Sequence, residues 1–228
     1  MAPTPSASRT LPSWRFWLPL VCQAALILAI PAQSLHTQLT GRTVILKTAP
    51  VDPYDLLRGY SVTLSYDISR VDTLRQLPGW SEFERQRSAN SEWPATRFFY
   101  LVLEAPGVAS TNPPSPWRAV RISGDRPTNL VENQVILRGQ IGNNTVPDGL
   151  ELQGRTSNNT VQYGLERYYI PEDQRDAINQ NINTAQANQA TQPIVVEVKV
   201  DAQGNAVPLS FWVTLGKASA KQTYHYQF

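Results

Sequence analysis

Cysteine and histidine are scarce in this chain of 228 residues. The one cysteine, Cys22, lies in an apolar stretch near the N-terminus, so the rest of the chain has no thiol for a disulfide, a nucleophile or a metal site. The histidines are His36 and His225, and a general base three residues from the chain end is poorly held. We therefore expect no disulfide, no bound metal, no cofactor and no catalytic constellation, which predicts a protein that is not an enzyme.

An excess of charge of one sign is also lacking. The chain has 20 Lys and Arg against 18 Asp and Glu, a net charge of +2, and its basic residues are interspersed. A balance this close to neutral argues against a nucleic-acid partner. Beyond residue 32, no apolar run reaches the roughly 20 residues that a membrane helix needs. The sequence therefore predicts at most one membrane crossing.

One long apolar run is present, at residues 16–32, after a polar start that carries Arg9 and Arg15. A helix of about 17 residues spans roughly 25 Å, near the lower limit for a membrane crossing. Trp14 and Trp17 would lie at the membrane interface, and the preceding arginines favour a cytoplasmic N-terminus. We predict a cytoplasmic tail at residues 1–15 and a single-pass transmembrane anchor at residues 16–34.

A cleaved signal peptide is the alternative for this segment. A positive start and a central apolar run fit a signal peptide as well, and residues 32–34 (A-Q-S) offer small residues at a cleavage spacing. Both interpretations export the remainder of the chain, which we predict to be one domain over residues 41–228.

Short runs of strand-like residues recur along that remainder, separated by Pro- and Gly-rich turns. They lie at residues 43–48, 60–69, 97–104, 117–123, 134–141, 161–170, 194–200 and 206–215. The run at 97–104 is almost continuously apolar, which predicts burial on both faces, and Gly139 suggests a bulge in the run at 134–141. We predict a mainly β fold of about eight or nine mostly antiparallel strands, arranged as a sandwich or a distorted barrel.

Two polar segments interrupt the strands. Pro171 and the acids after it are helix start signals, and Ile178, Ile182 and Ala185 share one helical face. They predict one short helix after Pro171. Residues 72–94 form a long excursion with a helical turn near residues 81–87, either a variable insertion or a lid or contact loop.

The residues at 52–68, D-P-Y-D-L-L-R-G-Y-S-V-T-L-S-Y-D-I, carry the clearest signals of local structure in the chain. Asp52 can cap a helical turn that Pro53 begins, Asp55 suits the positive end of that turn, and Gly59 can end it. From residue 60 the period changes to two, so Leu64 and Tyr66 share a face. The pattern predicts a capped turn at residues 52–59 followed by a half-buried strand.

This stretch, with the residues before it from Gly41, resembles the GDYXXLXY family, a group of bacterial membrane-anchored proteins without an assigned activity. Leu64 and Tyr66 match the name-giving motif, whereas Tyr60 and Ser61 stand where the family has Asp and Tyr. A second similar element begins at Tyr163. The matching positions are Asp52, Pro53, Asp55, Leu56, Arg58, Gly59, Leu64, Tyr66, Tyr163, Gly164, Glu166, Pro171 and Glu172. The resemblance implies a retained anchor in the bacterial plasma membrane and a periplasmic domain.

Three functions follow as hypotheses. The first is an uncharacterised membrane-anchored accessory protein that acts on a membrane or envelope protein partner. The second is an envelope carbohydrate- or peptide-binding module that uses Trp80, Trp93 and Trp117. The third is a hydrolase that uses Asp52, Asp55 and Glu166, because paired carboxylates can do acid–base chemistry.

A hard-cation site at Asp52, Asp55 and Asp67 is also conceivable from the ligand types. The spacing of these aspartates matches no EF-hand loop, and helix capping explains the first two. We therefore predict no metal at this stretch, with Arg58 pairing a nearby carboxylate.

Overall fold

The structure is a computed structural model, and it describes residues 14–49, 57–58, 61–89, 97–107, 112–141, 161–169, 175–187, 194–215 and 222–227. The chain divides into two compact units, Met1–His36 and Thr37–Phe228. The second unit carries the strands and is mostly β, as predicted.

A long N-terminal helix, α1, runs over Trp14–Thr40 and contains Pro19 and Pro31. Proline lacks the amide donor and crowds the preceding turn, so it bends a helix. The bend here is 42° between Trp14–Ala29 and Pro31–Thr40. Within the described part of the chain no unbroken helix is long and apolar enough to cross a membrane, whereas these two segments together have the length and composition to do so.

The largest sheet has five strands in the order β12-β11-β10-β1-β4, and every pair in it is antiparallel. Its strands are β1 (Arg42–Ala49), β4 (Ser65–Tyr66), β10 (Val195–Val200), β11 (Ala206–Leu215) and β12 (Gln222–Gln227). The turn between β10 and β11 has Gly204 at φ 89°. Glycine adopts this left-handed backbone conformation without strain. The runs predicted at residues 194–200 and 206–215 therefore pair as a hairpin.

Two smaller antiparallel sheets complete the β structure. The four-stranded sheet has the order β6-β5-β7-β8 and contains β5 (Arg97–Glu104), β6 (Arg118–Ser123), β7 (Gln134–Ile141) and β8 (Val161–Gln162). The three-stranded sheet has the order β2-β3-β9 and contains β2 (Leu57–Arg58), β3 (Ser61–Thr63) and β9 (Arg167–Tyr169). The described residues hold twelve strands, more than predicted, because the runs at 60–69 and 161–170 are each divided and two further strands occur, β2 and β12.

The run at residues 60–69 is one of those divided. β3 pairs with β9, whereas β4 pairs with β1, so the chain passes from one sheet to another at Leu64. A 3-10 turn over Asp67–Ser69 follows. The long uninterrupted strand was therefore a wrong prediction, since its halves find different partners, although Leu64, Tyr66 and Ile68 are all buried as expected.

The capped turn predicted at residues 52–59 fails at one place that the structure describes. Leu57 and Arg58 are strand residues paired with Val62 and Ser61. Asp52, Pro53, Asp55, Leu56 and Gly59 lie outside the described residues.

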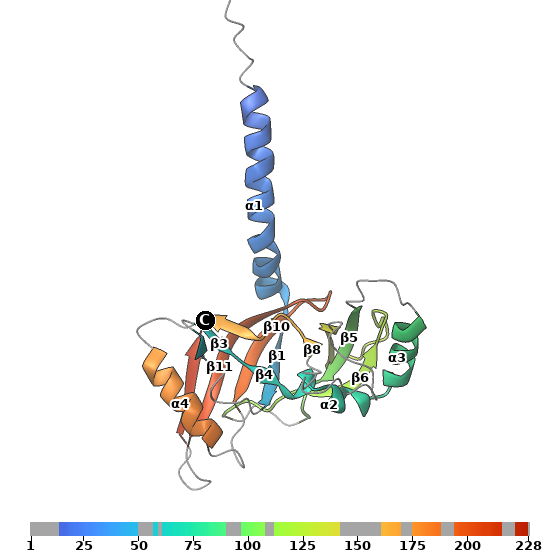
Figure 1. Ribbon diagram of the computed structural model, residues 1–228, viewed down its shortest axis with the longest axis vertical. Helices are drawn as coiled ribbons and strands as arrows, with labels where there is room; N and C mark the ends of the chain where they lie inside the picture. The colour runs from blue at the N-terminus through green and yellow to red at the C-terminus, as the bar shows by residue number, and fades with distance from the viewer. Residues whose placement is uncertain are drawn as a thin grey trace, which may run out of the picture. The chain divides into compact units, whose positions relative to one another are not determined.

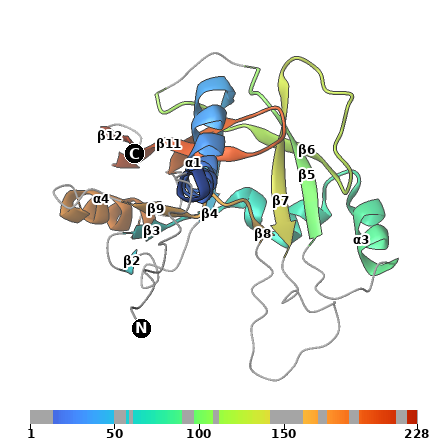
Figure 2. The ribbon, with the colours of Figure 1, turned by 90° about the horizontal axis from the view of Figure 1, so that it is seen from above.

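Three further helices cover the sheets: α2 (Val71–Arg75), α3 (Trp80–Ala89) and α4 (Arg175–Ala187). α3 lies against β6 and α4 against β11, on opposite sides of this unit (Figure 1, Figure 2). α4 confirms the helix predicted after Pro171, and its Ile178, Ile182 and Ala185 are buried. α3 confirms the helical segment predicted in the excursion. Pro171 and Glu172 lie outside the described residues.

One hydrophobic cluster joins the two larger sheets and the three helices. It takes Leu46 and Val196 from the five-stranded sheet, Leu101 and Leu137 from the four-stranded sheet, and Phe83 from α3, each at most 1% exposed. Burial of these side chains is the main driving force for folding of this unit.

The four-stranded sheet departs from two predictions. Phe98 on β5 is 47% exposed, so this strand is not buried on both faces along its whole length. The pairing of Gly139 with Phe99 is regular, so there is no bulge. Gly139 is required for space instead, because a Cβ there would overlap the ring of Phe99 and lie 2.8 Å from Cε1 of Tyr163.

Candidate functional site

The two sequence elements that resemble the family lie side by side. The Leu64 N–H donates to the carbonyl of Glu166 at 2.8 Å, and β3 pairs with β9 so that Thr63 lies opposite Arg167. The elements are about a hundred positions apart in sequence and are joined by backbone hydrogen bonds. This junction places Gly164 and Glu166 at the surface of the unit, whereas Tyr163 and Leu165 are buried.

A tyrosine pair closes the junction inside the protein. Tyr66 is fully buried, and its hydroxyl donates to the carbonyl of Leu165 at 2.8 Å. The hydroxyl of Tyr168 also contacts that of Tyr66. Since Tyr66 has one hydroxyl proton and gives it to Leu165, Tyr168 is the donor to Tyr66. The L-x-Y motif therefore acts through its side chains in the interior.

Tyr163 makes a second link between the elements. Its hydroxyl donates to the carbonyl of Ile68 at 2.7 Å, and its ring meets that of Phe99 edge-on. Burial, and then the nearby charge of Glu166, raise the pKa of Tyr163 well above its ordinary value. Burial also raises the pKa of Tyr168. Both tyrosines are therefore neutral hydrogen-bond donors at physiological pH.

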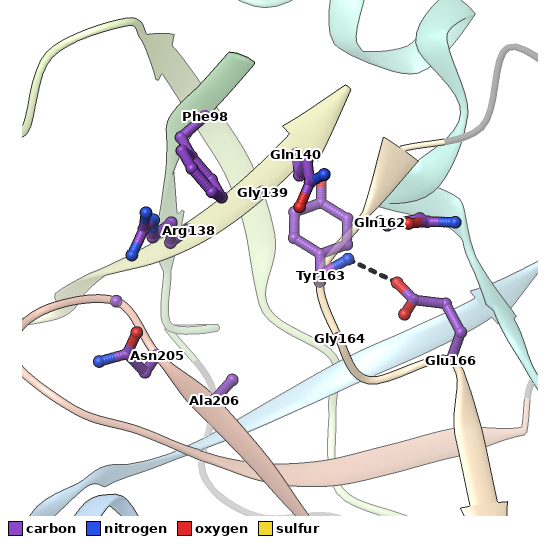
Figure 3. A pocket seen from close by; sticks show the side chains of 11 residues that line it. Phe98, Arg138, Gly139, Gln140, Gln162, Tyr163, Gly164, Glu166, Asn205 and Ala206 are labelled. Carbon is purple, nitrogen blue, oxygen red and sulfur yellow. Dashed lines mark hydrogen bonds between the residues drawn. The ribbon is translucent and has the colours of Figure 1, made fainter. Parts of the chain in front are cut away.

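A pocket of about 320 Å³ opens where the second element meets the four-stranded sheet (Figure 3). Side chains from four segments of the chain line it: Phe98, Arg138, Gln140, Gln162, Glu166 and Asn205. β5, β7 and β8 supply the first four, since Phe98 lies opposite Gln140 and Gln140 opposite Gln162. The pocket is therefore built on one face of the sheet by strand pairing.

Arg138 is the cation of this pocket. Its guanidinium carbon lies 3.8 Å from the centre of the Phe98 ring, a cation–π contact between neighbouring strands. Its Nε is shielded from solvent and has no hydrogen-bond partner among the described residues. This contact holds the guanidinium against the ring of Phe98.

Glu166 is the carboxylate of the pocket and lies across it from Arg138 in Figure 3. One of its oxygens accepts a hydrogen bond from the backbone N–H of Tyr163 at 2.5 Å. This bond closes the tight loop around Gly164, which has φ 77°. The loop therefore holds the Glu166 side chain at the pocket wall.

The turn between β10 and β11 forms the third wall. The backbone N–H of Arg138 donates to the carbonyl of Gly204 at 2.9 Å, and this bond holds the turn beside β7. Asp201 organises the turn, because its Oδ1 accepts from the backbone N–H groups of Gln203 and Asn205, each at 2.9 Å. The other oxygen, Oδ2, accepts from the Thr37 hydroxyl at 2.8 Å.

The Asp201 carboxylate is 5% exposed and ionised. Burial by itself would raise its pKa, but hydrogen bonds from Asn205, Thr37 and Gln203 outweigh burial and lower the pKa below its ordinary value. The last turn of α1 is thereby tied to the turn that forms a wall of the pocket.

The residues singled out in the sequence lie in different parts of the structure. Leu64 and Tyr66 are in the core, Tyr163 and Gly164 are at the pocket with Glu166, and Asp67 pairs with Lys47 at 2.8 Å. The side chain of Arg58 lies outside the described residues, so its predicted carboxylate partner stays a prediction. No group of three His, Cys, Asp or Glu side chains within the described ranges is placed to hold a metal ion.

Of the tryptophans proposed as a binding platform, Trp80 and Trp117 do not line this pocket. Trp80 and Trp117 are partly buried and pack against the core cluster, and Trp117 lies beneath the guanidinium of Arg42 at 6.0 Å. Trp93 lies outside the described residues. Sequence reasoning missed Phe98 and Arg138, although an aromatic and an arginine on neighbouring predicted strands are a weak signal of such a pair.

A family model described as GDYXXLXY protein matches residues 23–211. The chain belongs to the GDYXXLXY family. No curated protein and no solved structure matches the chain. The structure gives the family signature of this chain a physical role: the leucine and second tyrosine of the motif bond to the carbonyls of Glu166 and Leu165, and Tyr163, Gly164 and Glu166 of the same element line the pocket.

Proposed function

We propose that this GDYXXLXY-family chain is a membrane-tethered accessory protein, not an enzyme, whose exported domain binds a partner through the pocket at Arg138 and Glu166. One observation carries the proposal. The family element that begins at Tyr163 is bonded to the strand that carries Leu64, and it also lines a pocket. This pocket presents a cation, a carboxylate and three side-chain amides. A pocket in which a few polar groups converge is the usual form of a ligand-binding site.

The chemistry of the lining favours binding over catalysis. Among the described residues that line the pocket there is no Ser, Thr, Cys, His or Asp, and Glu166 is the one carboxylate. Acid–base hydrolysis with carboxylates needs two of them at a defined separation. Amide and guanidinium groups instead form directional hydrogen bonds that recognise a polar ligand.

The tether rests on α1. Its apolar side chains are exposed, for example Trp17 at 64%, Leu26 at 72% and Leu28 at 65%. Exposed apolar surface of this extent on a helix is unfavourable in water and favourable in lipid. We place the helix in the plasma membrane as a single span, with the N-terminus in the cytoplasm and residues 41–228 in the periplasm.

The tether is tested by fractionating cells that make the full chain and by measuring its intact mass. We expect the protein in the membrane fraction, resistant to extraction by salt, with the mass of the uncleaved chain. Recovery in a salt-soluble fraction, or a mass that lacks residues 1–34, would overturn the anchor.

The binding role is tested by photo-crosslinking in cells at Phe98, in the pocket. A photoreactive phenylalanine analogue there should capture a reproducible partner. The matched control is the same analogue at Val131, which is 56% exposed and does not line the pocket. The same products from both positions, or none from Phe98, would contradict the proposal.

A further inference from the structure

Arg138 is held ready to bind an anion, but no anion is supplied by the described part of the chain. Its guanidinium stacks on Phe98 and forms no ion pair or hydrogen bond with a described side chain, and its Nε is buried without an acceptor. Leaving a buried charged donor unpaired is unfavourable, because the group has lost its water and gained no acceptor. Such a group calls for an explanation, and an anion that accepts from it is one that the position of Arg138 in a pocket favours.

The stacked geometry favours a planar anion. A guanidinium is planar and its N–H groups point outward in its own plane, so contact of its central carbon with a ring face leaves N–H groups at its edge for an anion. Two parallel N–H groups match the two oxygens of a carboxylate, and such a bidentate pair is stronger than a neutral hydrogen bond. Arg138 therefore fits a carboxylate at the edge of its guanidinium.

The rest of the pocket limits what carries that carboxylate. Its volume of about 320 Å³ is at the lower end for ligand sites, which corresponds to one or two amino-acid residues. Gln140, Gln162 and Asn205 each offer an amide donor and an amide acceptor, the same groups as a peptide unit. Glu166 across the pocket disfavours a second acid, because like charges repel.

We infer that the pocket binds the free C-terminal end of a short peptide segment, with its carboxylate on Arg138 and its last peptide groups on the amides of Gln140, Gln162 and Asn205. The inference rests on the proposed binding function and names the chemistry of the ligand. Two sources share this chemistry, a free short peptide and the C-terminus of a protein chain. A free dipeptide would also place its ammonium group toward Glu166.

Calorimetric titration of the full chain in detergent micelles tests the inference. The probes are dipeptides with a small, an aromatic, an acidic or a basic last residue, each also made as the C-terminal amide and as the N-acetyl derivative. We expect at least one unmodified dipeptide to bind, and its amide to bind at least about tenfold more weakly. Equal binding of acid and amide, or no binding by any of the dipeptides, would overturn the inference.

The N-acetyl probes separate the two sources. If acetylation weakens binding, the ammonium group is recognised and the ligand is a free peptide. If the acetylated and free forms bind equally, the ligand is the end of a longer chain. Both results leave the carboxylate on Arg138.

Variants assign the contact to its residue. Arg138→Gln should weaken binding at least about tenfold, and Arg138→Lys should restore part of it, because lysine keeps the charge but not the planar fork. Arg118→Gln is the matched control, since Arg118 is on the same sheet with its side chain 81% exposed, and it should change nothing. A melting curve without peptide shows whether Arg138→Gln folds, and if it does not, the acid-against-amide comparison on the unaltered protein still decides.

The inference and the proposed function can fail separately. Crosslinks from Phe98 in cells together with no dipeptide binding would remove the peptide-end ligand and leave an interaction protein. Dipeptide binding together with no crosslinked partner would leave a peptide site and remove the accessory role.

Discussion

The hydroxyl groups of Tyr66 and Tyr168 meet in the interior of the domain, where Tyr66 donates onward to the carbonyl of Leu165. This chain of hydrogen bonds joins a strand residue of the name-giving motif to the element that lines the pocket. Removing a buried hydroxyl of this kind costs stability, because the polar atoms that it bonded stay buried and lose that hydrogen bond without gaining one to water.

Tyr66→Phe should therefore lower the free energy of unfolding by about 1–3 kcal/mol, since it removes the hydroxyl that bonds to the Leu165 carbonyl and to the Tyr168 hydroxyl. Denaturant unfolding of the full chain measures the change. Tyr224→Phe is the control, because the Tyr224 hydroxyl bonds to Gln222 in an exposed pair. An equally small loss in both variants would show that the buried tyrosine pair contributes nothing to stability.

The raised pKa values of Tyr163 and Tyr168 predict a loss of stability in alkali. Above about pH 10 the unfolded chain releases tyrosine protons that the folded protein retains, so stability falls by about 1.4 kcal/mol per pH unit for each of these tyrosines. Melting temperatures measured between neutral pH and pH 11 should show this decline. Tyr168→Phe should reduce the slope, and an unchanged slope in that variant would contradict the assignment.

Asp201 predicts the opposite dependence, in acid. Its pKa is lowered in the folded protein, so its contribution is present above the unfolded value of about 3.9 and is lost as the pH falls below it. Asp201→Asn should cost about 1–3 kcal/mol at neutral pH, because the variant loses charge-assisted hydrogen bonds to Thr37 and to the turn.

The difference between wild type and Asp201→Asn should then shrink toward pH 3, which denaturant unfolding at several pH values measures. Asp72→Asn is the control, since the Asp72 side chain is 75% exposed, and it should be neutral within about 0.5 kcal/mol. A difference between wild type and Asp201→Asn that is constant with pH would show that the carboxylate charge is not what matters.

Gly139→Ala should destabilise the domain by about 1–3 kcal/mol, because the added methyl group would push apart the rings of Phe99 and Tyr163. Gly107→Ala tests whether this is a local packing effect, since no atom lies within 4 Å of a Cβ at Gly107. If Gly139→Ala lowers the free energy of unfolding no more than Gly107→Ala does, the rings of Phe99 and Tyr163 move aside without an energetic cost. Since Tyr163 lines the pocket, peptide binding should weaken together with stability.

Local patterns in the chain were sufficient for much of the secondary structure. Alternation at residues 194–200 and 206–215, with a glycine turn between them, specified the β10–β11 hairpin. The apolar stripe of Ile178, Ile182 and Ala185 specified α4 and its buried face. These features depend on neighbours within a few positions, so periodicity reports them.

Other features depended on partners distant in sequence. The alternating run at residues 60–69 gave no sign that it changes sheets at Leu64, because that break is set by pairing with β9 on one side and β1 on the other. The exposure of Phe98 was hidden in the same way, since the run that contains it reads as uniformly apolar.

Sequence alone established the mostly β character, the family and the apolar N-terminal helix, because composition, motif and period are properties of neighbouring residues. The pocket was decided by tertiary structure. Its walls come from residues 98, 138–140, 162–166 and 204–206, which strand pairing and the β10–β11 turn bring to one face. Contacts between segments this far apart depend on sheet register and turn geometry, and neither is encoded at any single position.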